Sequence, residues 1–279
     1  MLLIGDAAQE LEKVSDGTVH TCVTSPPYYG LRDYGVDNQI GFNQSLADYI
    51  SGLVNIFAQV HRTLRNDGTL WLNLGNCYAQ RKMPSGLKPK DLIGVPWRVA
   101  FALQQWGWYL RSDIIWSKPN AMPESVRDRP TSAHEHIFLL SKSRTYHYDF
   151  EAIKEPCKKS YSGNKKRKIA DDGERQRLNN GMGSSIPWIG DDRGKNARNV
   201  WMVASTPSGE GHWAVWPSAL IKPCILAGAP LGGVVLDPFL GSGTTAQVAM
   251  NLGRQWIGCE INPAFEVMIR RNTAQQVLL

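Results

Sequence analysis

The sequence predicts an α/β fold built on a doubly wound, mostly parallel sheet. Segments rich in β-branched and other apolar residues alternate with segments whose apolar residues recur at helical spacing, and turn residues separate them. Strands that alternate with helices form parallel sheets, because each helix returns the chain to the same end of the sheet. The chain of 279 residues, 42% hydrophobic, suffices for one large domain or for a domain of roughly 200 residues with an insertion.

In the first half of the chain, the strand expected at 19–24 has the clearest boundary. Its β-branched residues stop at Ser25-Pro26-Pro27, and consecutive prolines cannot continue a central strand. Asn66-Asp67-Gly68 is a turn signal between a helical pattern and a buried strand. The expected elements are a strand and turn at 2–6, a helix at 7–14, the strand at 19–24, a helix at 45–65, a strand at 69–74, a helix at 91–106 and strands at 108–116 and 136–140.

In the second half, the apolar signal fades between about 150 and 205 and then returns. The expected elements after it are a helix at 216–226, a strand at 233–237, a helix at 245–252, a strand at 255–259 and a helix from about 263. We therefore expect a core formed by residues 1–150 and 205–279, interrupted by an insert at 151–204.

The composition excludes several classes of protein. No run of 18 apolar residues occurs, so no transmembrane helix is expected, and the first residues lack the charged and apolar regions of a signal peptide. The five cysteines (22, 77, 157, 224 and 259) form no C-x-x-C pair, which argues against a zinc site and a secreted disulfide scaffold. This pattern predicts a protein of the reducing cytoplasm.

Most of the net charge of +6 comes from one segment. Residues 151–200 contain twelve Lys and Arg against seven Asp and Glu, a net charge of +5 in fifty residues. Such a concentration is typical of a surface that binds a polyanion. A solvated basic loop without a partner explains the charge about equally well when the segment is considered alone.

A glycine-rich turn from Asp237 to Thr245 (D-P-F-L-G-S-G-T-T) lies between an expected strand and an expected helix. Glu260 ends the next strand, 23 positions after Asp237, where an acidic side chain commonly binds a ribose diol. The order of strand, glycine-rich turn, helix, strand and acidic residue predicts a nucleoside cofactor. A tightly packed αβ turn is the alternative. No Lys follows Gly243, and a carboxylate at Asp237 repels a pyrophosphate but suits an ammonium group. The turn therefore favours S-adenosylmethionine over NAD or ATP.

The motif Thr24-Ser25-Pro26-Pro27-Tyr28 follows the strand expected at 19–24. Ligands of open α/β sheets bind at the carboxyl ends of the strands, and two prolines fix the directions of the preceding carbonyl groups. Tyr28 adds a flat ring. A flipped nucleobase needs an aromatic face and acceptors for its exocyclic amine, so the motif suits such a base. A proline-stiffened strand exit with a core tyrosine is the alternative.

Together these two motifs resemble those of the DNA amino-methyltransferases, which methylate N4 of cytosine or N6 of adenine. The segments 118–126, 134–143 and 212–217 are also similar to that family, so the resemblance covers the chain outside about 155–200. It implies a Rossmann-like sheet of the S-adenosylmethionine-dependent methyltransferase type, circularly permuted in the β-type motif order, with a target-recognition insert.

The resemblance also implies roles for individual residues. In the catalytic motif, Ser25 and Pro26 would accept hydrogen bonds from the amine, with Pro27 and Tyr28 completing the motif. For the cofactor, Asp6 would contact the adenine, although a turn or N-cap aspartate explains it nearly as well. The other expected cofactor-binding residues are Trp216, Pro217, Asp237, Phe239, Gly241, Gly243, Thr244 and Glu260. S-adenosylmethionine is the expected cofactor, and no metal is expected, since His134-Glu135-His136 has no third partner.

The expected reaction is direct methyl transfer to the exocyclic N4 of cytosine, because Ser at position 25 is found mostly in the cytosine enzymes of this family. N6 of adenine remains the alternative base. A catalytically silent DNA-binding relative and an RNA or small-molecule methyltransferase remain as other classes. A C5-cytosine enzyme is not favoured, because neither Pro156-Cys157 nor Pro223-Cys224 is followed by the required Gln.

The expected partner is double-stranded DNA, in a bacterial or phage-encoded system, with a cognate restriction endonuclease as a further expected partner. Candidate DNA contacts are Lys118, Arg127 and Arg129, with a plain surface loop as the alternative, and Lys165, Lys166, Arg167 and Lys168 in the insert. No membrane contact is expected, and both monomer and homodimer remain open.

Overall fold

The structure, a computed structural model, describes residues 1–274 apart from 32, 34, 37, 38, 82, 157–193 and 206–215. Its strands are β1 (Leu2–Ile4), β2 (Val19–Thr24), β3 (Leu64–Leu74), β4 (Tyr109–Ser117), β5 (His134–Ser141), β6 (Val200–Met202), β7 (Val234–Asp237) and β8 (Gln255–Glu260). Its helices are α1 (Ala7–Glu10), α2 (Leu46–Thr63), α3 (Val95–Trp106), α4 (Ser218–Gly228), α5 (Thr244–Asn251) and α6 (Glu266–Ala274), with 3-10 helices at Leu11–Lys13, Glu151–Ile153 and Pro263–Phe265.

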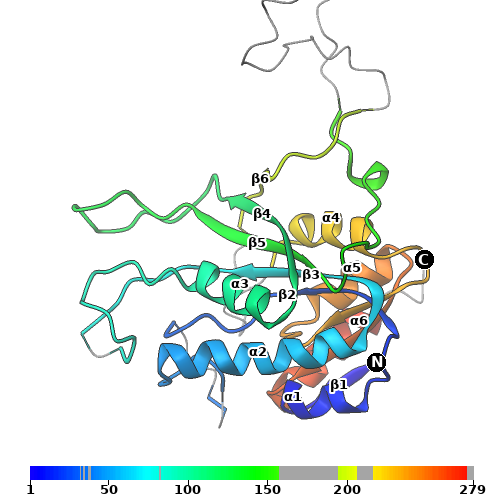
Figure 1. The fold of residues 1–279 in the computed structure, drawn as a ribbon, viewed down its shortest axis with the longest axis horizontal. Helices are drawn as coiled ribbons and strands as arrows, with labels where there is room; N and C mark the ends of the chain where they lie inside the picture. Colours follow the sequence, from blue (N-terminus) through cyan, green and yellow to red (C-terminus); the bar gives the residue numbers. More distant parts are fainter. Residues whose placement is uncertain are drawn as a thin grey trace, which may run out of the picture.

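The strands form one eight-stranded sheet in the order β1-β8-β7-β2-β3-β5-β4-β6 (Figure 1). β5 runs antiparallel to its neighbours β3 and β4, and the other pairs are parallel. The mostly parallel sheet that the sequence predicts is therefore confirmed. β2 lies beside β7, so the strand that leads into Ser25 is paired with the strand that ends at Asp237.

Helices cover both faces of the sheet, as a doubly wound fold requires. In Figure 1, α1 and α2 lie on one side of the sheet and α4 lies on the other. Successive residues of the central strands point to opposite faces of the sheet. Cys22 packs with α2 and α3, whereas Val23 and Trp71 pack with α4 and α5. A smaller cluster joins Leu240 of the glycine-rich turn to Ile269 of α6.

Local sequence signals explain where α2 and α5 begin. The Ser45 hydroxyl accepts a hydrogen bond from the backbone N–H of Asp48 at 3.1 Å and caps the first turn of α2. α5 begins after Gly243, which adopts a left-handed conformation with φ of +88°. A residue with a side chain adopts this conformation at a cost, so glycine suits the sharp turn from β7 into α5.

Three expected elements differ from the structure. Residues 66–68 belong to β3: Val19 pairs with Leu64 and Thr21 with Thr69, so the predicted turn is a bulge inside the strand. The helix expected at 91–106 begins only at Val95, after a left-handed Gly94. The helix expected at 7–14 is a single α-helical turn that continues as a 3-10 helix.

The edge strand β6 was not predicted, because it is short and mostly exposed. Val200 is 52% and Met202 is 75% exposed, so the segment shows no apolar pattern. It pairs with β4 inside the range 151–204 that the sequence assigns to the insert. The described ends of that range therefore pack on the core, and residues 157–193 lie outside the described residues.

Candidate active site

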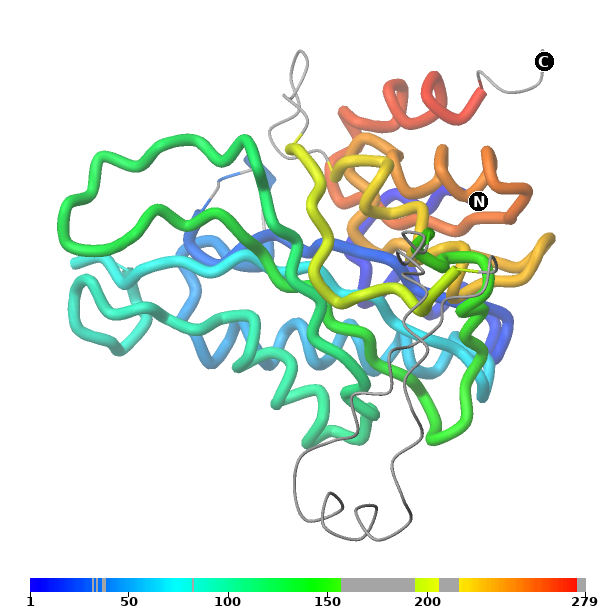
Figure 2. Tube along the Cα trace, turned by 90° about the horizontal axis from the view of Figure 1, so that it is seen from above, coloured from blue at the N-terminus to red at the C-terminus, as the bar shows by residue number. Residues whose placement is uncertain are grey.

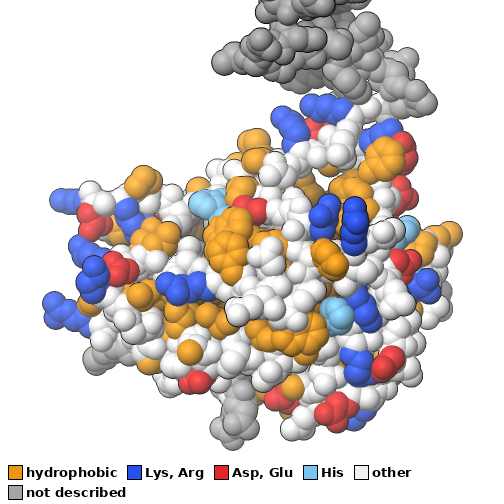
Figure 3. All heavy atoms as spheres, viewed as in Figure 1, with side chains coloured by type: hydrophobic (Ala, Val, Ile, Leu, Met, Phe, Trp, Pro, Cys, Tyr) orange, Lys and Arg blue, Asp and Glu red, His pale blue; other side chains and the backbone are white. Residues whose placement is uncertain are grey.

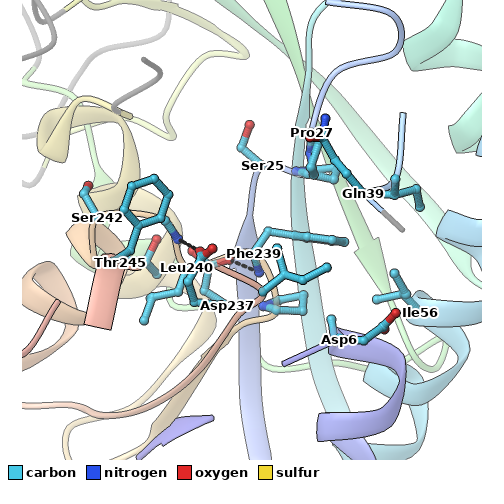
Figure 4. Close-up of a pocket in the computed structure, with 18 of the residues that line it drawn as sticks. Asp6, Ser25, Pro27, Gln39, Ile56, Asp237, Phe239, Leu240, Ser242 and Thr245 are labelled. Atoms are coloured by element: carbon cyan, nitrogen blue, oxygen red, sulfur yellow. Dashed lines mark hydrogen bonds between the residues drawn. The ribbon is translucent and has the colours of Figure 1, made fainter. Parts of the chain in front are cut away.

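A pocket lies at the carboxyl edge of the parallel strands (Figure 4). Each of β1, β2, β7 and β8 contributes the residues at or just after its carboxyl end, because parallel strands end at the same edge of a sheet. The lining residues are Gly5, Asp6, Ala7, Ser25, Pro26, Pro27, Gln39, Ile40, Ile56, Trp216, Asp237, Pro238, Phe239, Leu240, Gly241, Ser242, Thr244, Thr245, Glu260, Ile261 and Phe265.

Asp237 connects the two sequence motifs within this pocket. It is only 4% exposed, and its Oδ1 accepts hydrogen bonds from the Thr24 hydroxyl at 2.6 Å and from the Phe239 N–H at 3.0 Å. Burial raises the pKa of Asp237, while hydrogen bonds from Thr24, Thr245 and Phe239 oppose this rise. The carboxylate therefore holds the first residues of the turn against the end of β2.

Glu260 connects the turn to the end of β8. Its Oε2 accepts a hydrogen bond from the Gly241 N–H at 2.8 Å, and its Oε1 accepts one from the Asn262 N–H at 2.9 Å. Burial raises the pKa of Glu260 to about 7, although these two hydrogen bonds favour the ionised form. Glu260 thus has a pKa close to neutrality and lies in the pocket wall.

Not all of the other expected cofactor-binding residues line the pocket. Asp6, Trp216, Phe239, Gly241 and Thr244 line the pocket. The Asp6 carboxylate also caps α1, since its Oδ1 accepts from the Ala8 N–H at 2.7 Å. Two further residues, Pro217 and Gly243, are not among the lining residues: each is instead the N-cap of the helix that follows it.

The pocket suits S-adenosylmethionine by the chemistry of its walls. Ile56, Phe239 and Phe265 provide apolar surface for a flat nucleobase, and the Phe239 ring contacts Phe57 edge to face with centroids 6.4 Å apart. Three carboxyl groups, Asp6, Asp237 and Glu260, line the pocket, and the described lining residues include no Lys or Arg. A cationic nucleoside without phosphate fits such walls, whereas a phosphate has no cationic partner there.

The Ser25–Tyr28 motif contributes three of its residues to the same pocket, and Tyr28 is not among the lining residues. Ser25, Pro26 and Pro27 are lining residues, and the Pro27 carbonyl accepts a hydrogen bond from the Tyr49 hydroxyl at 2.9 Å. The Tyr28 ring packs against Gly75, where an added Cβ would lie 2.5 Å from the ring. Glycine at position 75 is therefore what allows the ring to occupy this place. Burial and the neighbouring Glu135 carboxylate raise the pKa of Tyr28 well above its ordinary value, so it is a neutral phenol.

Asn73 is a site residue that the sequence analysis missed. Its Oδ1 accepts hydrogen bonds from the Tyr28 hydroxyl at 2.8 Å, from Trp216 Nε1 at 2.5 Å and from the Ser25 hydroxyl at 3.3 Å. One amide oxygen thus accepts hydrogen bonds from both hydroxyl groups of the Ser25–Tyr28 motif and from a residue of the pocket wall. A signal existed in the sequence, because Asn73 is the one polar residue in the buried run 70–74.

Glu135, also missed as a site residue, lies behind Tyr28. Its Oε2 accepts a hydrogen bond from the Tyr28 hydroxyl at 2.5 Å, and its Oε1 pairs with Lys118. The sequence analysis expects Lys118 to contact DNA. In the structure the Lys118 ammonium forms this ion pair and lies over the Trp116 ring, 4.3 Å from its centroid.

Two further candidate DNA contacts, Arg127 and Arg129, belong to the loop between β4 and β5. Figures 1 and 2 both show this loop projecting beside the loop that connects β3 to α3. The two loops are joined by an ion pair between Lys90 and Asp128 at 2.6 Å and by Arg129, whose guanidinium lies 3.8 Å from the Tyr78 ring centroid. Arg129 also pairs with Glu124, whereas Arg127 is exposed.

Basic side chains gather at the edge of the molecule where these loops project (Figure 3). The candidates Lys165, Lys166, Arg167 and Lys168 lie outside the described residues. In the described part of the chain, no three or more His, Cys, Asp or Glu side chains lie together as a metal site requires. Within the same residues, no helix is long and apolar enough to cross a membrane.

An open, mostly parallel sheet whose carboxyl-edge pocket is lined by three carboxyl groups and apolar side chains suits the class of S-adenosylmethionine-dependent methyltransferases. Residues 19–271 match the DNA methylase family of N6 and N4 methyltransferases. The chain belongs to this family. It is a site-specific DNA methyltransferase.

Relatives agree with this assignment, and solved structures share the fold. The type II methyltransferase M.SmaI of Serratia marcescens is 46% identical over 95% of this chain and 87% of its own length, and M.Cfr9I of Citrobacter freundii is 45% identical over 95% and 84%. The fold is similar to that of PvuII DNA methyltransferase (cytosine-N4-specific), with a TM-score of 0.69 and 18% identity over 100% of this chain and 87% of that one. It is also similar to TTHA0409 of Thermus thermophilus in complex with S-adenosyl-L-methionine, with a TM-score of 0.64 and 20% identity over 99% and 94%.

Proposed function

We propose that the protein methylates the exocyclic N4 of cytosine in duplex DNA, after the target base has rotated out of the helix. One observation supports this most directly: Ser25 and Pro26 line the same pocket as Asp237, Phe239 and Gly241 of the glycine-rich turn. An amine bound at Ser25 therefore lies next to the cofactor pocket. A base inside a duplex cannot reach such a pocket, so base flipping is part of the proposal.

The residues at the end of β2 orient the amine. Its nitrogen lone pair is delocalised into the ring and is a poor nucleophile. Hydrogen bonds from its N–H groups to Ser25 Oγ and to the Pro26 carbonyl draw the nitrogen toward tetrahedral geometry, while Tyr28 provides a ring on which the base stacks. When bound, S-adenosylmethionine supplies an electrophilic methyl group on a sulfonium. Ser25 and the Pro26 carbonyl would hold the amine so that its lone pair faces that methyl group. The electron pair of the broken bond would stay on the sulfur, and the proton lost by the methylated amine would pass to solvent.

Cofactor binding is assigned to the walls of the pocket. Phe239 packs on the adenine, Asp6 accepts from its amine, and Glu260 accepts from the ribose hydroxyls. Trp216 closes the pocket from the segment before α4, and Pro217 begins that helix. The backbone of Gly241 and Thr244 surrounds the methionine portion, Gly243 allows the turn between them, and Asp237 faces its ammonium group.

The described cysteines support direct transfer without a covalent enzyme intermediate. Cys22, Cys224 and Cys259 are buried, and burial raises the pKa of the half-buried Cys77 thiol to about 11. None of these four residues lines the pocket. A thiolate nucleophile of the kind that C5-cytosine chemistry needs is therefore not available from them.

Cytosine is favoured as the base by Ser25 and by the name of PvuII DNA methyltransferase, which is cytosine-N4-specific. Adenine N6 is the second candidate, because the matched family includes both kinds of enzyme. We propose that the segment 151–204, with Lys165 to Lys168, reads the DNA sequence and that Arg127 and Arg129 contact phosphates. The relatives are named type II methyltransferases, which supports a cognate restriction endonuclease as a partner and a place in the bacterial cytoplasm.

The test is to express the protein in cells that lack other DNA methyltransferases and to digest their DNA to nucleosides for mass spectrometry. N4-methylcytosine is the expected product, and the position of the modified bases in sequenced DNA gives the recognition site. N6-methyladenine as the sole new nucleoside would contradict the assignment of the base. Methylated RNA with unmodified DNA would contradict the substrate class. The oligomeric state, for which monomer and homodimer remain proposals, is measured by sedimentation.

A further inference from the structure

Two hydrogen-bond acceptors lie beside the hydroxyl group of Tyr28. Asn73 Oδ1 lies 2.8 Å and Glu135 Oε2 lies 2.5 Å from the Tyr28 oxygen. The orientation of the Asn73 amide is fixed, because its Nδ2 donates to the His136 carbonyl at 3.0 Å while Trp216 Nε1 donates to its Oδ1. Both partners of Tyr28 therefore accept hydrogen bonds, and the hydroxyl hydrogen must point toward them.

The Glu135 carboxylate is held as an acceptor by Lys118. The ammonium of Lys118 pairs with Oε1, so Oε2 is left for Tyr28. The side chains of Glu135 and Lys118 are only 13% and 21% exposed, which places the pair away from the solvent-exposed ion pairs of the surface. A carboxylate that is paired with an ammonium group has no hydrogen to donate.

The direction of the Tyr28 hydroxyl has a consequence for the substrate. A hydroxyl that donates its single hydrogen to Glu135 or Asn73 can still accept a hydrogen bond at its oxygen, and the Ser25 hydroxyl donates to it there at 3.5 Å. Because the Ser25 hydrogen points to Tyr28 or to Asn73, the lone pairs of Ser25 Oγ are left for an amine bound in the pocket. An exocyclic amine has two N–H donors and requires acceptors, and a hydroxyl hydrogen directed at it would repel it.

We propose that Glu135 is a positioning residue for the methyl transfer. It takes the hydroxyl hydrogen of Tyr28, so that the Tyr28 oxygen accepts the Ser25 hydrogen and Ser25 Oγ faces the target amine as an acceptor, next to the Pro26 carbonyl. Lys118 pairs with the Glu135 carboxylate and fixes it in place. The inference rests on the proposed methylation of an exocyclic amine, and it holds equally for cytosine N4 and adenine N6.

A double-mutant cycle with Glu135→Gln and Tyr28→Phe tests the inference. The amide that Glu135→Gln introduces can donate to the Tyr28 oxygen and reverse its polarity, while the shape of the side chain is preserved. We expect Glu135→Gln to lower kcat at least about tenfold and to change KM for DNA and cofactor by less than about threefold. Because Glu135 acts through the hydroxyl, the double variant should be no slower than Tyr28→Phe alone.

The matched control is Asp113→Asn. Asp113 is a partly exposed carboxylate on β4 that pairs with His136 of the same β4–β5 hairpin at 2.9 Å, and no hydrogen bond connects it to Tyr28. This variant should keep kcat within about twofold of wild type. Melting curves of all variants show whether a loss of rate reflects a loss of folded protein.

Each outcome either supports the positioning role of Glu135 or contradicts it. A kcat for Glu135→Gln within twofold of wild type, or losses that multiply in the double variant, would overturn the positioning role. If Glu135→Gln does not fold, Tyr28→Phe decides alone, since it removes the acceptor oxygen, and wild-type kcat in that variant contradicts the inference. The rate is measured as label transferred from the cofactor to DNA, and the methylated base is identified separately. A wrong base therefore contradicts the proposed function without affecting the cycle.

Discussion

Thr24 donates a hydrogen bond of 2.6 Å to the carboxylate of Asp237, although the two residues lie 213 positions apart in the chain. Thr24 is the last residue of β2, and Asp237 is the last residue of β7. The two strands are neighbours in the sheet. This contact joins the end of the strand that leads into the catalytic motif to the first residue of the cofactor turn.

The first prediction concerns this contact. Thr24→Val keeps the shape of a fully buried side chain but leaves the Asp237 carboxylate with one donor fewer. An unsatisfied buried acceptor costs about 1–3 kcal/mol, so the free energy of unfolding should fall by that amount. Urea denaturation measures this free energy of unfolding. Thr24→Ser, which keeps the hydroxyl, should lose less, and equal losses in the two variants would argue against the hydrogen bond as the cause.

A second prediction follows from Glu260. In the unfolded chain its carboxyl group has the ordinary pKa of 4.5, whereas in the folded protein the pKa is about 7. Between these values the folded protein holds a proton that the unfolded chain has released, so raising the pH through this window favours unfolding. The contribution of Glu260 to stability should fall between pH 4.5 and 7, by at most about 3 kcal/mol, and remain level above pH 7.

Urea denaturation of the cofactor-free protein at several pH values measures this effect. Glu260→Gln cannot ionise and is the control, because the other titrating groups are unchanged in it. The stability of wild type relative to Glu260→Gln should decline across the window. A difference that is constant from pH 5 to pH 8 would show that Glu260 ionises alike in both states.

A third prediction concerns Ser25. Ser25→Ala removes one of the proposed acceptors of the amine but leaves the cofactor turn intact. Turnover should fall on the order of 10–100-fold, with a much smaller change in the Kd for S-adenosylmethionine. Single-turnover kinetics and calorimetry measure the two quantities. Tyr28→Ala should behave in the same way, and full activity of Ser25→Ala would refute the amine-orienting role.

The fourth prediction separates two arginines of the β4–β5 loop. Arg127 is exposed, whereas Arg129 pairs with Glu124 and lies over Tyr78. If Arg127 contacts a phosphate, Arg127→Ala should reduce the slope of log K against log salt by about 0.9 and weaken binding to all DNA sequences alike. Arg129→Ala should also lower the melting temperature, because it removes contacts that join the two loops.

Arg270→Ala is the matched control for the salt dependence. It removes the same charge from α6, where Arg270 pairs with Glu266. Fluorescence anisotropy on duplex DNA at several salt concentrations measures the slopes. Equal slopes for Arg127→Ala and wild type would show that the side chain does not neutralise a phosphate.

Much of the fold was predictable because its signals are local. The prolines at 26 and 27 fix the end of β2, and Gly243 fixes the turn into α5. β6 was not predictable, because a short exposed edge strand has no apolar periodicity, and its pairing with β4 is a long-range contact. The turn signal at 66–68 was misinterpreted for the same reason: pairing with β2 decides that these residues form a bulge.

The sequence by itself determined the two motifs, the class of fold and the family to which the chain belongs. It did so because strand exits and glycine turns are set by residues close together in the chain. Only the tertiary structure decided that Thr24 donates a hydrogen bond to Asp237 and that Lys118 pairs with Glu135. It also decided that Asn73 accepts hydrogen bonds from Ser25, Tyr28 and Trp216. These contacts depend on the order of strands in the sheet, which local sequence patterns do not specify.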